Sequence, residues 1–293
     1  MNLGIIASSS NKILPATQLW VDAVYAAGGI LSSNNIFYTN LLVDRLQQNG
    51  LWNDLKAYYP FVGATANSVA TMNAHKINLR NPGTYDFTYP DSIANGHGIN
   101  TFVCTNSNHY CNTNLAPSTA FTDINNMSFG SYVYNGPQIS NNMIFGARGP
   151  GGGSSTKMVG LSSYFSLAPG TPTVYAAIGT YSIPGGYVRG TYSPIVSGAY
   201  TGAVYTARNS STSLKLFDRG NLITTETTAN TGTLPTNNVY INGYNNNGSS
   251  QKFPSNAITI SSAWFANKAF SNAEMTTFYQ IENEIITLRI AAN

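Results

Sequence analysis

Residues 213–227 read SLKLFDRGNLITTET, and this stretch decides the fold class. Apolar Leu214, Leu216 and Ile223 alternate with polar residues, as in strands that bury one face. Between the two runs, residues 219–221 place a glycine and an asparagine where a tight turn needs positive φ. The stretch therefore predicts an antiparallel β-hairpin.

Similar short runs, separated by clusters of Gly, Asn, Pro and Ser, continue on both sides of this hairpin. They begin after residue 63 and include TFVCT, SFGSYVY, NMIFGA, MVGLSSYFSL, TVYAAIGTY, GAYTGAVYTA, NVYINGYN and AITISSAWFA. Many short strands at this spacing are typical of a sandwich or barrel. These runs show no internal repeat of fixed period. The chain is therefore predicted to be mainly β from residue 63 onward.

The preceding residues have helical periodicity instead. Pro15 suits a helix start, Gly28 and Gly29 suit its end, and Leu19, Trp20, Ala23, Val24 and Ala27 form its apolar face.

A second helix is expected from a cap at Ser33 or Asn34 to Gly50, with Leu42 and Leu46 buried. A third, short helix is expected in LWNDLKAY, residues 51–58, and Pro60 would end it. We therefore divide the chain into a helical attachment or oligomerisation module, 1–62, and a β-sandwich, 63–293. Apolar residues before the first helix suit docking to a partner: Leu3, Ile5, Ile6, Ile13 and Leu14.

Composition narrows the functional classes. Of 293 residues only 9% are charged, the formal net charge is +3, and 12% are aromatic. The 14 Lys and Arg residues form no run, so we expect no nucleic-acid partner, and no apolar stretch reaches the ~20 residues of a membrane span. A surface made polar by Asn, Ser, Thr, Gly and Tyr suits uncharged polar ligands such as glycans.

The acidic residues near the C-terminus, in KAFSNAEMTTFYQIENEII at 268–286, look structural. Ser271 and Glu274 have the spacing of a capping box. The helix that follows would bury Met275, Phe278, Ile281, Ile285 and Leu288. Glu282 and Glu284 are two residues apart, point in different directions and are expected to be solvated.

No catalytic motif is present. A glycosidase needs two facing carboxylates, and the E-x-D-x-x-E strand motif of glucanases does not occur. Asp86 and Asp91, with Pro90 between them, favour turn formation. Asp123 has no evident acidic partner. A G-x-S-x-G elbow is also missing. We predict no catalytic residues.

Metal and phosphate sites are not predicted either, and no cofactor is expected. His97, Cys104, His109 and Cys111 lie close in sequence, but their spacing matches no zinc pattern. A local Cys104–Cys111 disulfide across a turn remains an alternative. The Asn-rich run 237–249 offers no carboxylate to calcium. The Gly-rich run 146–157 departs from the P-loop motif, because Lys157 follows a threonine.

Glycan binding is the most plausible chemistry, since aromatic rings stack on sugars and amides bind hydroxyls. Tyrosines among glycines in GTYSIPGGYVRGTYSP, and one tyrosine followed by asparagines, are the candidates: Tyr181, Tyr187, Tyr192, Tyr244, Asn245 and Asn246.

The C-terminal, N-terminal and middle parts of the sequence also resemble known proteins. NVYINGYNNNGS at 238–249 and ITISSAWFANKAFSNAEMTTFYQIENEI at 258–285 resemble the end of a concanavalin A-like lectin/glucanase jelly roll, of the laminin-G or pentraxin type. LLVDRLQQNGLWNDLKAYYPFVGATAN with HKINLRNPG, and HYCNTNLAPSTAFTDINNMSFGSYVYN, are similar to tailed-bacteriophage and prophage proteins that carry this jelly roll.

The resemblance covers about residues 15–293 and implies architecture and setting, not an activity. It implies a non-enzymatic structural protein at the virion surface, as a tail fibre, head fibre or decoration. The N-terminal segment would bind other virion proteins, the chain would form homo-oligomers, and the sandwich could bind host-surface polysaccharide. The alternative is a glycan-cleaving depolymerase on the same fold.

Overall fold

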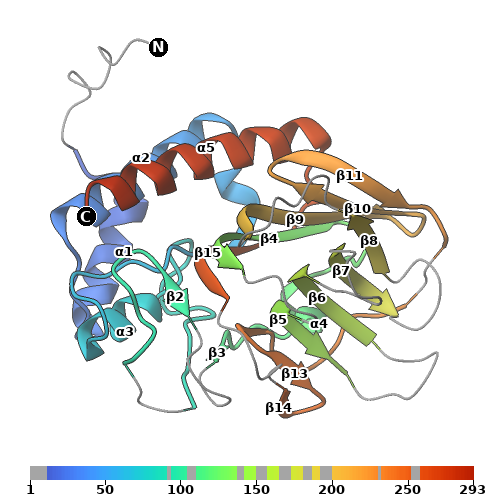
Figure 1. Ribbon diagram of the computed structural model, residues 1–293, viewed down its shortest axis with the longest axis horizontal. Coiled ribbons are helices and arrows are strands. Elements are labelled where there is room, and N and C mark those ends of the chain that lie inside the picture. The colour runs from blue at the N-terminus through green and yellow to red at the C-terminus, as the bar shows by residue number, and fades with distance from the viewer. Residues whose placement is uncertain are drawn as a thin grey trace.

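Two β-sheets and a layer of helices form the computed structural model (Figure 1). It describes residues 12–90, 94–103, 110–136, 142–149, 157–164, 173–180, 187–191, 200–229, 232–251 and 258–293. The helices are α1 (Pro15–Ala26), α2 (Ser33–Gln48), the 3₁₀ turn η2 (Trp52–Asp54), α3 (Val69–His75), α4 (Pro117–Ala120) and α5 (Asn272–Ala291).

The first sheet has the strand order β1-β15-β4-β9-β10-β11, and β2 pairs with β15. Its strands are β1 (Leu55–Tyr59), β2 (Phe102–Val103), β4 (Met127–Gly136), β9 (Tyr200–Ser210), β10 (Ser213–Asp218), β11 (Asn221–Glu226) and β15 (Thr259–Ala266).

The second sheet has the order β14-β13-β5-β6-β7-β8, with β12 bridging β3 and β5. Its strands are β3 (Cys111–Asn112), β5 (Asn142–Arg148), β6 (Lys157–Tyr164), β7 (Thr173–Thr180), β8 (Tyr187–Thr191), β12 (Tyr240–Ile241), β13 (Tyr244–Asn246) and β14 (Ser249–Gln251). The predicted mainly β jelly-roll sandwich, preceded by a small set of helices, is confirmed.

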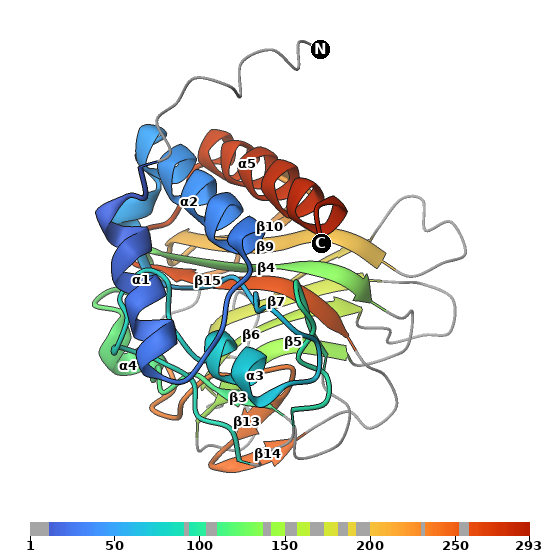
Figure 2. The same cartoon turned by 90° about the vertical axis from the view of Figure 1, so that its left-hand side faces the viewer.

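The first sheet is covered on both faces, as Figure 2 shows. One core lies between the sheets, and a second lies between the first sheet and helices α2 and α5. Alternate residues of one strand therefore enter different cores: Ala263 and Phe265 of β15 face the second sheet, whereas Trp264 faces the helices. Double burial explains why the β15 sequence, TISSAWFA, is almost continuously apolar or small.

The opening hairpin is confirmed. Strands β10 and β11 pair antiparallel, with Asp218 opposite Asn221. Arg219 and Gly220 have φ values of 48° and 75°, as in a type I′ turn. A second turn of this kind joins β13 to β14 through Asn247 and Gly248, whose φ values are 52° and 90°. The Asn/Gly-rich run at 237–249 is thus partly a hairpin turn.

Two of the three N-terminal helices agree with the sequence predictions. Helix α1 begins at Pro15 and buries Trp20 and Val24, but Leu19, predicted on its buried face, is 64% exposed. In α2 the cap is Ser32, one residue earlier than predicted, because its hydroxyl accepts the Asn35 amide. The predicted helix at 51–58 is wrong.

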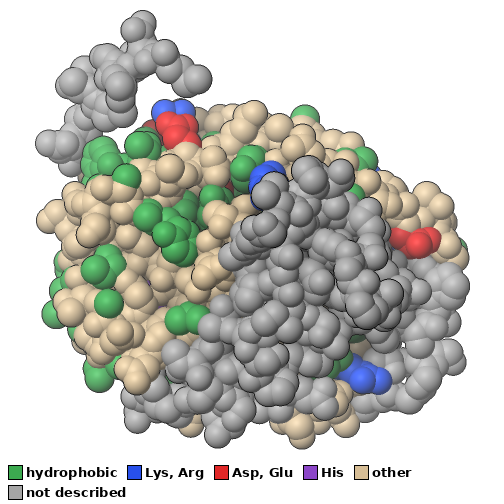
Figure 3. All heavy atoms as spheres, in the orientation of Figure 1, with side chains coloured by type: hydrophobic (Ala, Val, Ile, Leu, Met, Phe, Trp, Pro, Cys, Tyr) green, Lys and Arg blue, Asp and Glu red, His purple; other side chains and the backbone are tan. Residues whose placement is uncertain are grey.

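Residues 52–54 of that segment form the turn η2, and residues 55–59 form β1, which pairs with β15 at the edge of the first sheet. Tertiary pairing with a strand some 200 residues away outweighs the weak local periodicity. The division into 1–62 and 63–293 stays a prediction. On the described part of the face in view, Figure 3 shows the charged side chains as small separate spots, with hydrophobic side chains scattered over its left-hand side.

Candidate functional site

A polar pocket of about 410 Å³ opens beside the edge strand β1. Three segments far apart in sequence meet there: η2 with the start of β1, the loop 80–85, and the residue after β15. They supply the lining residues Asn53, Asp54, Leu55, Lys56, Arg80, Asn81, Thr84, Tyr85 and Asn267. The volume lies within the range of small-ligand sites.

Asn78 fixes the loop against β1. Its side-chain oxygen accepts the amides of Tyr58 and Arg80, both at 3.0 Å. Its amide nitrogen donates to the carbonyls of Lys56 at 3.2 Å and Thr84 at 2.9 Å. A buried side chain that makes four such bonds holds both pocket walls at a set separation.

Asp86 closes the same loop from its far end. Its carboxylate accepts the Asn78 amide at 2.8 Å and the Gly83 amide at 3.0 Å. Burial raises the pKa of Asp86, and these two backbone donors oppose that rise. The predicted turn-forming role of this residue is confirmed.

Tyr85, between these anchors, has a φ of 61°, the left-handed region that a tyrosine rarely adopts. Its carbonyl accepts the Tyr59 hydroxyl at 2.7 Å, which helps to hold the strained backbone. Such strain persists only where surrounding contacts fix it, and it concentrates at functional sites.

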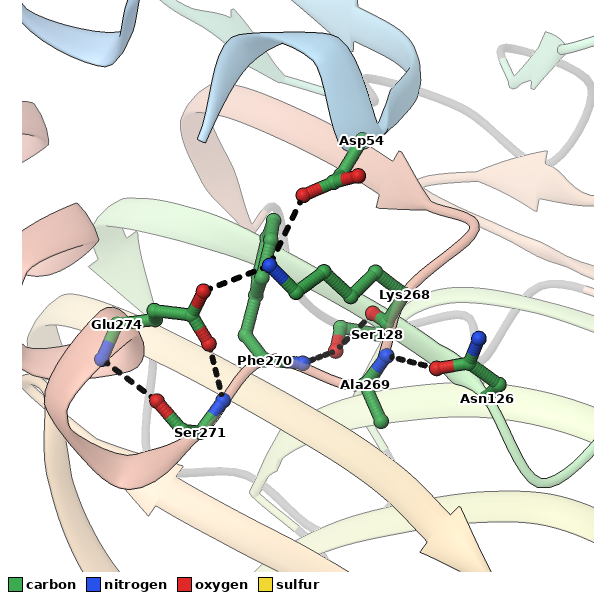
Figure 4. Close-up of polar contacts among 8 residues, drawn as sticks. All are labelled: Asp54, Asn126, Ser128, Lys268, Ala269, Phe270, Ser271 and Glu274. Carbon is green, nitrogen blue, oxygen red and sulfur yellow. Dashed lines mark hydrogen bonds and ion pairs between the residues drawn. The ribbon is translucent and has the colours of Figure 1, made fainter. Parts of the chain in front are cut away.

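The carboxylate on the pocket wall is already paired. The Lys268 ammonium lies 3.1 Å from the Asp54 carboxylate and 2.8 Å from that of Glu274, and it sits over the Phe270 ring (Figure 4). The hydrogen bond to Glu274, with Asp54 adding to it, raises the pKa of Lys268. The Asn267 amide donates to the Asp54 carbonyl at 2.9 Å and joins the end of β15 to η2.

Hydrogen-bonding groups remain on the pocket surface. Within the described part of the chain, four side chains of the pocket lining form no hydrogen bond: those of Asn53, Asn81, Thr84 and Asn267. Amides and hydroxyls in this arrangement can donate to and accept from a polyhydroxylated ligand.

Of the residues predicted to bind glycans, Tyr244, Asn245 and Asn246 do not line this pocket. Tyr181 and Tyr192 lie outside the described residues, and Tyr187 begins β8. Tyr244 is only 7% exposed and packs with Met143 and Met158 on the outer face of the second sheet.

Asn245 and Asn246 also belong to strand β13 rather than to a loop. Asn245 is buried, and its side chain donates to the Asn238 carbonyl and accepts the Gly248 amide. These contacts shape the hairpin. A glycan-binding role for the six residues stays a prediction.

The histidine and cysteine cluster shows no metal arrangement within the described residues. His97 is fully buried, and its Nδ1 lies 2.9 Å from Nδ1 of His75. Cys111 is buried in β3. Cys104 and His109 lie outside the described residues, so the disulfide alternative stays untested.

The acidic residues divide by structural role. The Ser271–Glu274 capping box is confirmed, as Figure 4 shows. Asp123 and Glu226 each accept a backbone amide two residues later, as turn residues do. Asp91 lies outside the described residues.

The prediction that Glu282 is solvated is wrong, whereas Glu284 is exposed. The fully buried Glu282 carboxylate accepts the hydroxyls of Tyr58, Tyr205 and Ser262 from β1, β9 and β15. Burial raises the pKa of Glu282, and these hydroxyls oppose the rise.

A sequence signal for this burial existed. Residue 282 follows Phe278 by four and precedes Ile285 by three, so it lies on the buried stripe. Burial also lowers the pKa of Arg289, one further heptad along that stripe, to about 10. The cluster joins α5 to the first sheet and has no exposed face, so its role is structural.

No protein-family model and no curated protein matches the sequence. Solved structures do match. Domain 4 of AbnA, a GH43 extracellular arabinanase from Geobacillus stearothermophilus in complex with arabinotriose, is 14% identical with a TM-score of 0.46, over 78% of this chain and 98% of that one.

The botulinum neurotoxin serotype D ligand-binding domain in complex with N-acetylneuraminic acid is 11% identical with a TM-score of 0.49, over 79% of this chain and 52% of that one. Trypanosoma rangeli sialidase in complex with 2,3-difluorosialic acid is 9% identical with a TM-score of 0.47, over 92% of this chain and 38% of that one. This chain thus spans about half or less of the latter two. At these scores the matches say nothing of what this chain binds.

Within the described part of the chain, no helix has the length and hydropathy needed to cross a membrane.

Proposed function

We propose that this chain is a non-enzymatic, glycan-binding structural protein of a tailed-phage virion surface. The polar pocket beside β1 carries the glycan-binding part of the proposal, because it combines a fixed frame with unpaired amide and hydroxyl side chains. The resemblance of the N-terminal and middle segments to phage proteins that carry a jelly roll supports the setting.

The absence of catalysis is part of the proposal. Hydrolysis of a glycosidic bond needs two carboxylates on opposite sides of the bond. Among the described residues that line the pocket, Asp54 is the one carboxylate, and Lys268 binds it. The arrangement supports binding without cleavage.

The N-terminal helices supply the attachment surface in this proposal. Four large apolar side chains on or between α1 and α2 are strongly exposed: Leu19, Tyr25, Ile30 and Phe37. Exposed apolar residues gathered on neighbouring elements suit contact with another protein. The partners would be other virion proteins and copies of this chain, and repeated copies would raise the avidity of a weak glycan site.

The decisive experiment is a glycan array that includes bacterial surface polysaccharides, followed by titration of hits and a reducing-end assay. We expect binding without new reducing ends. Asn81→Ala, which removes one exposed pocket amide, should weaken binding, whereas Gln47→Ala, an exposed amide on α2, should not.

Release of reducing ends would overturn the non-enzymatic proposal and favour the depolymerase. Absence of any glycan binding would overturn the binding role. Light scattering of the purified protein tests self-association, and Phe37→Ser should reduce it.

A further inference from the structure

The charges on the pocket lining are unequal. Lys56 and Arg80 place two positive charges there against one negative charge from Asp54. The Asp54 carboxylate contacts Lys268 at 3.1 Å and makes no ion pair within 4 Å to either pocket cation in the described residues. Among the described residues, neither Lys56 nor Arg80 takes part in an ion pair.

Arg80 is held in one orientation. Its Nε donates to the Trp52 carbonyl at 3.1 Å, and its guanidinium lies over the Trp52 ring, 5.4 Å from the centroid. Both contacts restrict the rotation of a side chain that otherwise loses much entropy on binding. Among the described residues, neither terminal nitrogen of Arg80 has a hydrogen-bond partner.

A guanidinium fixed through Nε presents its two terminal nitrogens as a planar fork. This geometry matches the two oxygens of a carboxylate, which a point charge such as lysine does not reproduce. Its backbone is fixed as well, because the Arg80 amide donates to the Asn78 side chain at 3.0 Å. The fork is thus pre-organised before any ligand arrives.

We infer that the pocket takes an acidic saccharide, whose carboxylate pairs with the terminal nitrogens of Arg80. Lys56 supplies a second positive charge, and Asn53, Asn81, Thr84 and Asn267 bind ring hydroxyls. This inference rests on the proposed glycan-binding function and adds the chemical class of the ligand.

The test compares two matched probes, oligogalacturonate and its methyl ester, titrated by calorimetry and by saturation-transfer NMR. The ester keeps the sugar ring and its hydroxyls but replaces each carboxylate by an uncharged methyl ester. The acid should bind, and the ester should bind roughly 10- to 100-fold more weakly, as expected for loss of a charge-assisted pair. Raising the salt concentration should weaken binding of the acid alone.

Three variants locate the site. Arg80→Gln should lower affinity for the acid by roughly 10- to 100-fold while leaving affinity for the ester unchanged. Arg80→Lys, which keeps the charge but loses the fork, should recover only part of this loss. Arg45→Gln, on the exposed face of α2, should change neither.

Thermal unfolding of each variant separates a binding defect from misfolding. If Arg80→Gln unfolds at a lower temperature than the wild type, Lys56→Gln serves as the second probe. It should weaken binding of the acid but not of the ester. Equal binding of acid and ester would overturn the acidic ligand and leave glycan binding intact. If Arg80→Gln and Lys56→Gln both bind the acid as tightly as the wild type does, the assignment of the ligand to this pocket is wrong. If no saccharide binds at all, the proposed function itself is wrong.

Discussion

The buried His75, whose ring lies beside that of the buried His97, should make the protein sensitive to acid. Neither ring is exposed, and Phe61 packs edge-on against His75 with ring centroids 5.5 Å apart. Burial lowers the pKa of His75 from 6.5 to about 3, and the nearby positive Arg289 adds to the effect.

The direction of the pH effect on stability follows from the number of protons that the folded and unfolded chains bind. Between pH 3 and pH 6.5 the unfolded chain binds a proton at His75 that the folded chain does not, so stability rises with pH in this window. The contribution of His75 to the free energy of unfolding should therefore fall by about 2.5 kcal/mol between pH 7 and pH 4.5, since one pKa unit corresponds to about 1.4 kcal/mol. Glu282 acts in the opposite sense, because its raised pKa makes the ionised form costly in the folded state.

Urea unfolding of the wild type and of His75→Asn at both pH values isolates the contribution of His75 to the pH dependence of the free energy of unfolding. The asparagine can still hydrogen-bond to His97 but cannot titrate. The variant will be less stable at both pH values because it leaves a cavity. Its loss between pH 7 and pH 4.5 should nevertheless be smaller than that of the wild type by about 2.5 kcal/mol. Equal losses in the two proteins would refute the reasoning.

Three further perturbations probe the helix-covered face of the first sheet, each by chemical denaturation at pH 7. Glu282→Ala should cost about 3–5 kcal/mol, because three buried hydroxyls lose their acceptor near a buried arginine, and Glu284→Ala should change stability by less than about 0.5 kcal/mol. Gly130→Ala should cost about 1–3 kcal/mol, since the added carbon would lie 2.2 Å from the Tyr205 ring. An unchanged midpoint of denaturation would mean that the ring moves freely. Ser271→Ala should cost about 1 kcal/mol through loss of the N-cap, and Glu274→Gln, which keeps a capping side chain, should cost less.

Features set by neighbouring residues were predictable from sequence. The hairpin at 213–227 follows from alternation and a two-residue turn, and the cap at Ser271 follows from its spacing to Glu274. Features set by distant residues were not. Local periodicity suggests a helix at 51–58, yet pairing with β15 makes residues 55–59 a strand.

The buried carboxylate and the pocket show the same limit. Glu282 is tolerable inside only because Tyr58, some 220 residues earlier, and Tyr205 supply hydroxyls. The pocket likewise combines residues 53–56, 80–85 and 267, and neither charge nor motif in any one segment reveals it. The glycan residues predicted from exposed tyrosines rest on composition, which cannot show that Tyr244 is buried.

The place of β15 has a consequence for biosynthesis. This strand lies between β1 and β4, so the first sheet joins strands from the start and the end of the chain. Helix α5, which covers that sheet, is synthesised after β15. A nascent chain that has emerged only as far as β14 therefore carries β1 and β4 with exposed edges and an uncovered apolar face. Assembly of this sheet must wait until β15 and α5 have emerged, which favours a chaperone during synthesis and makes products that lack these two elements prone to aggregate.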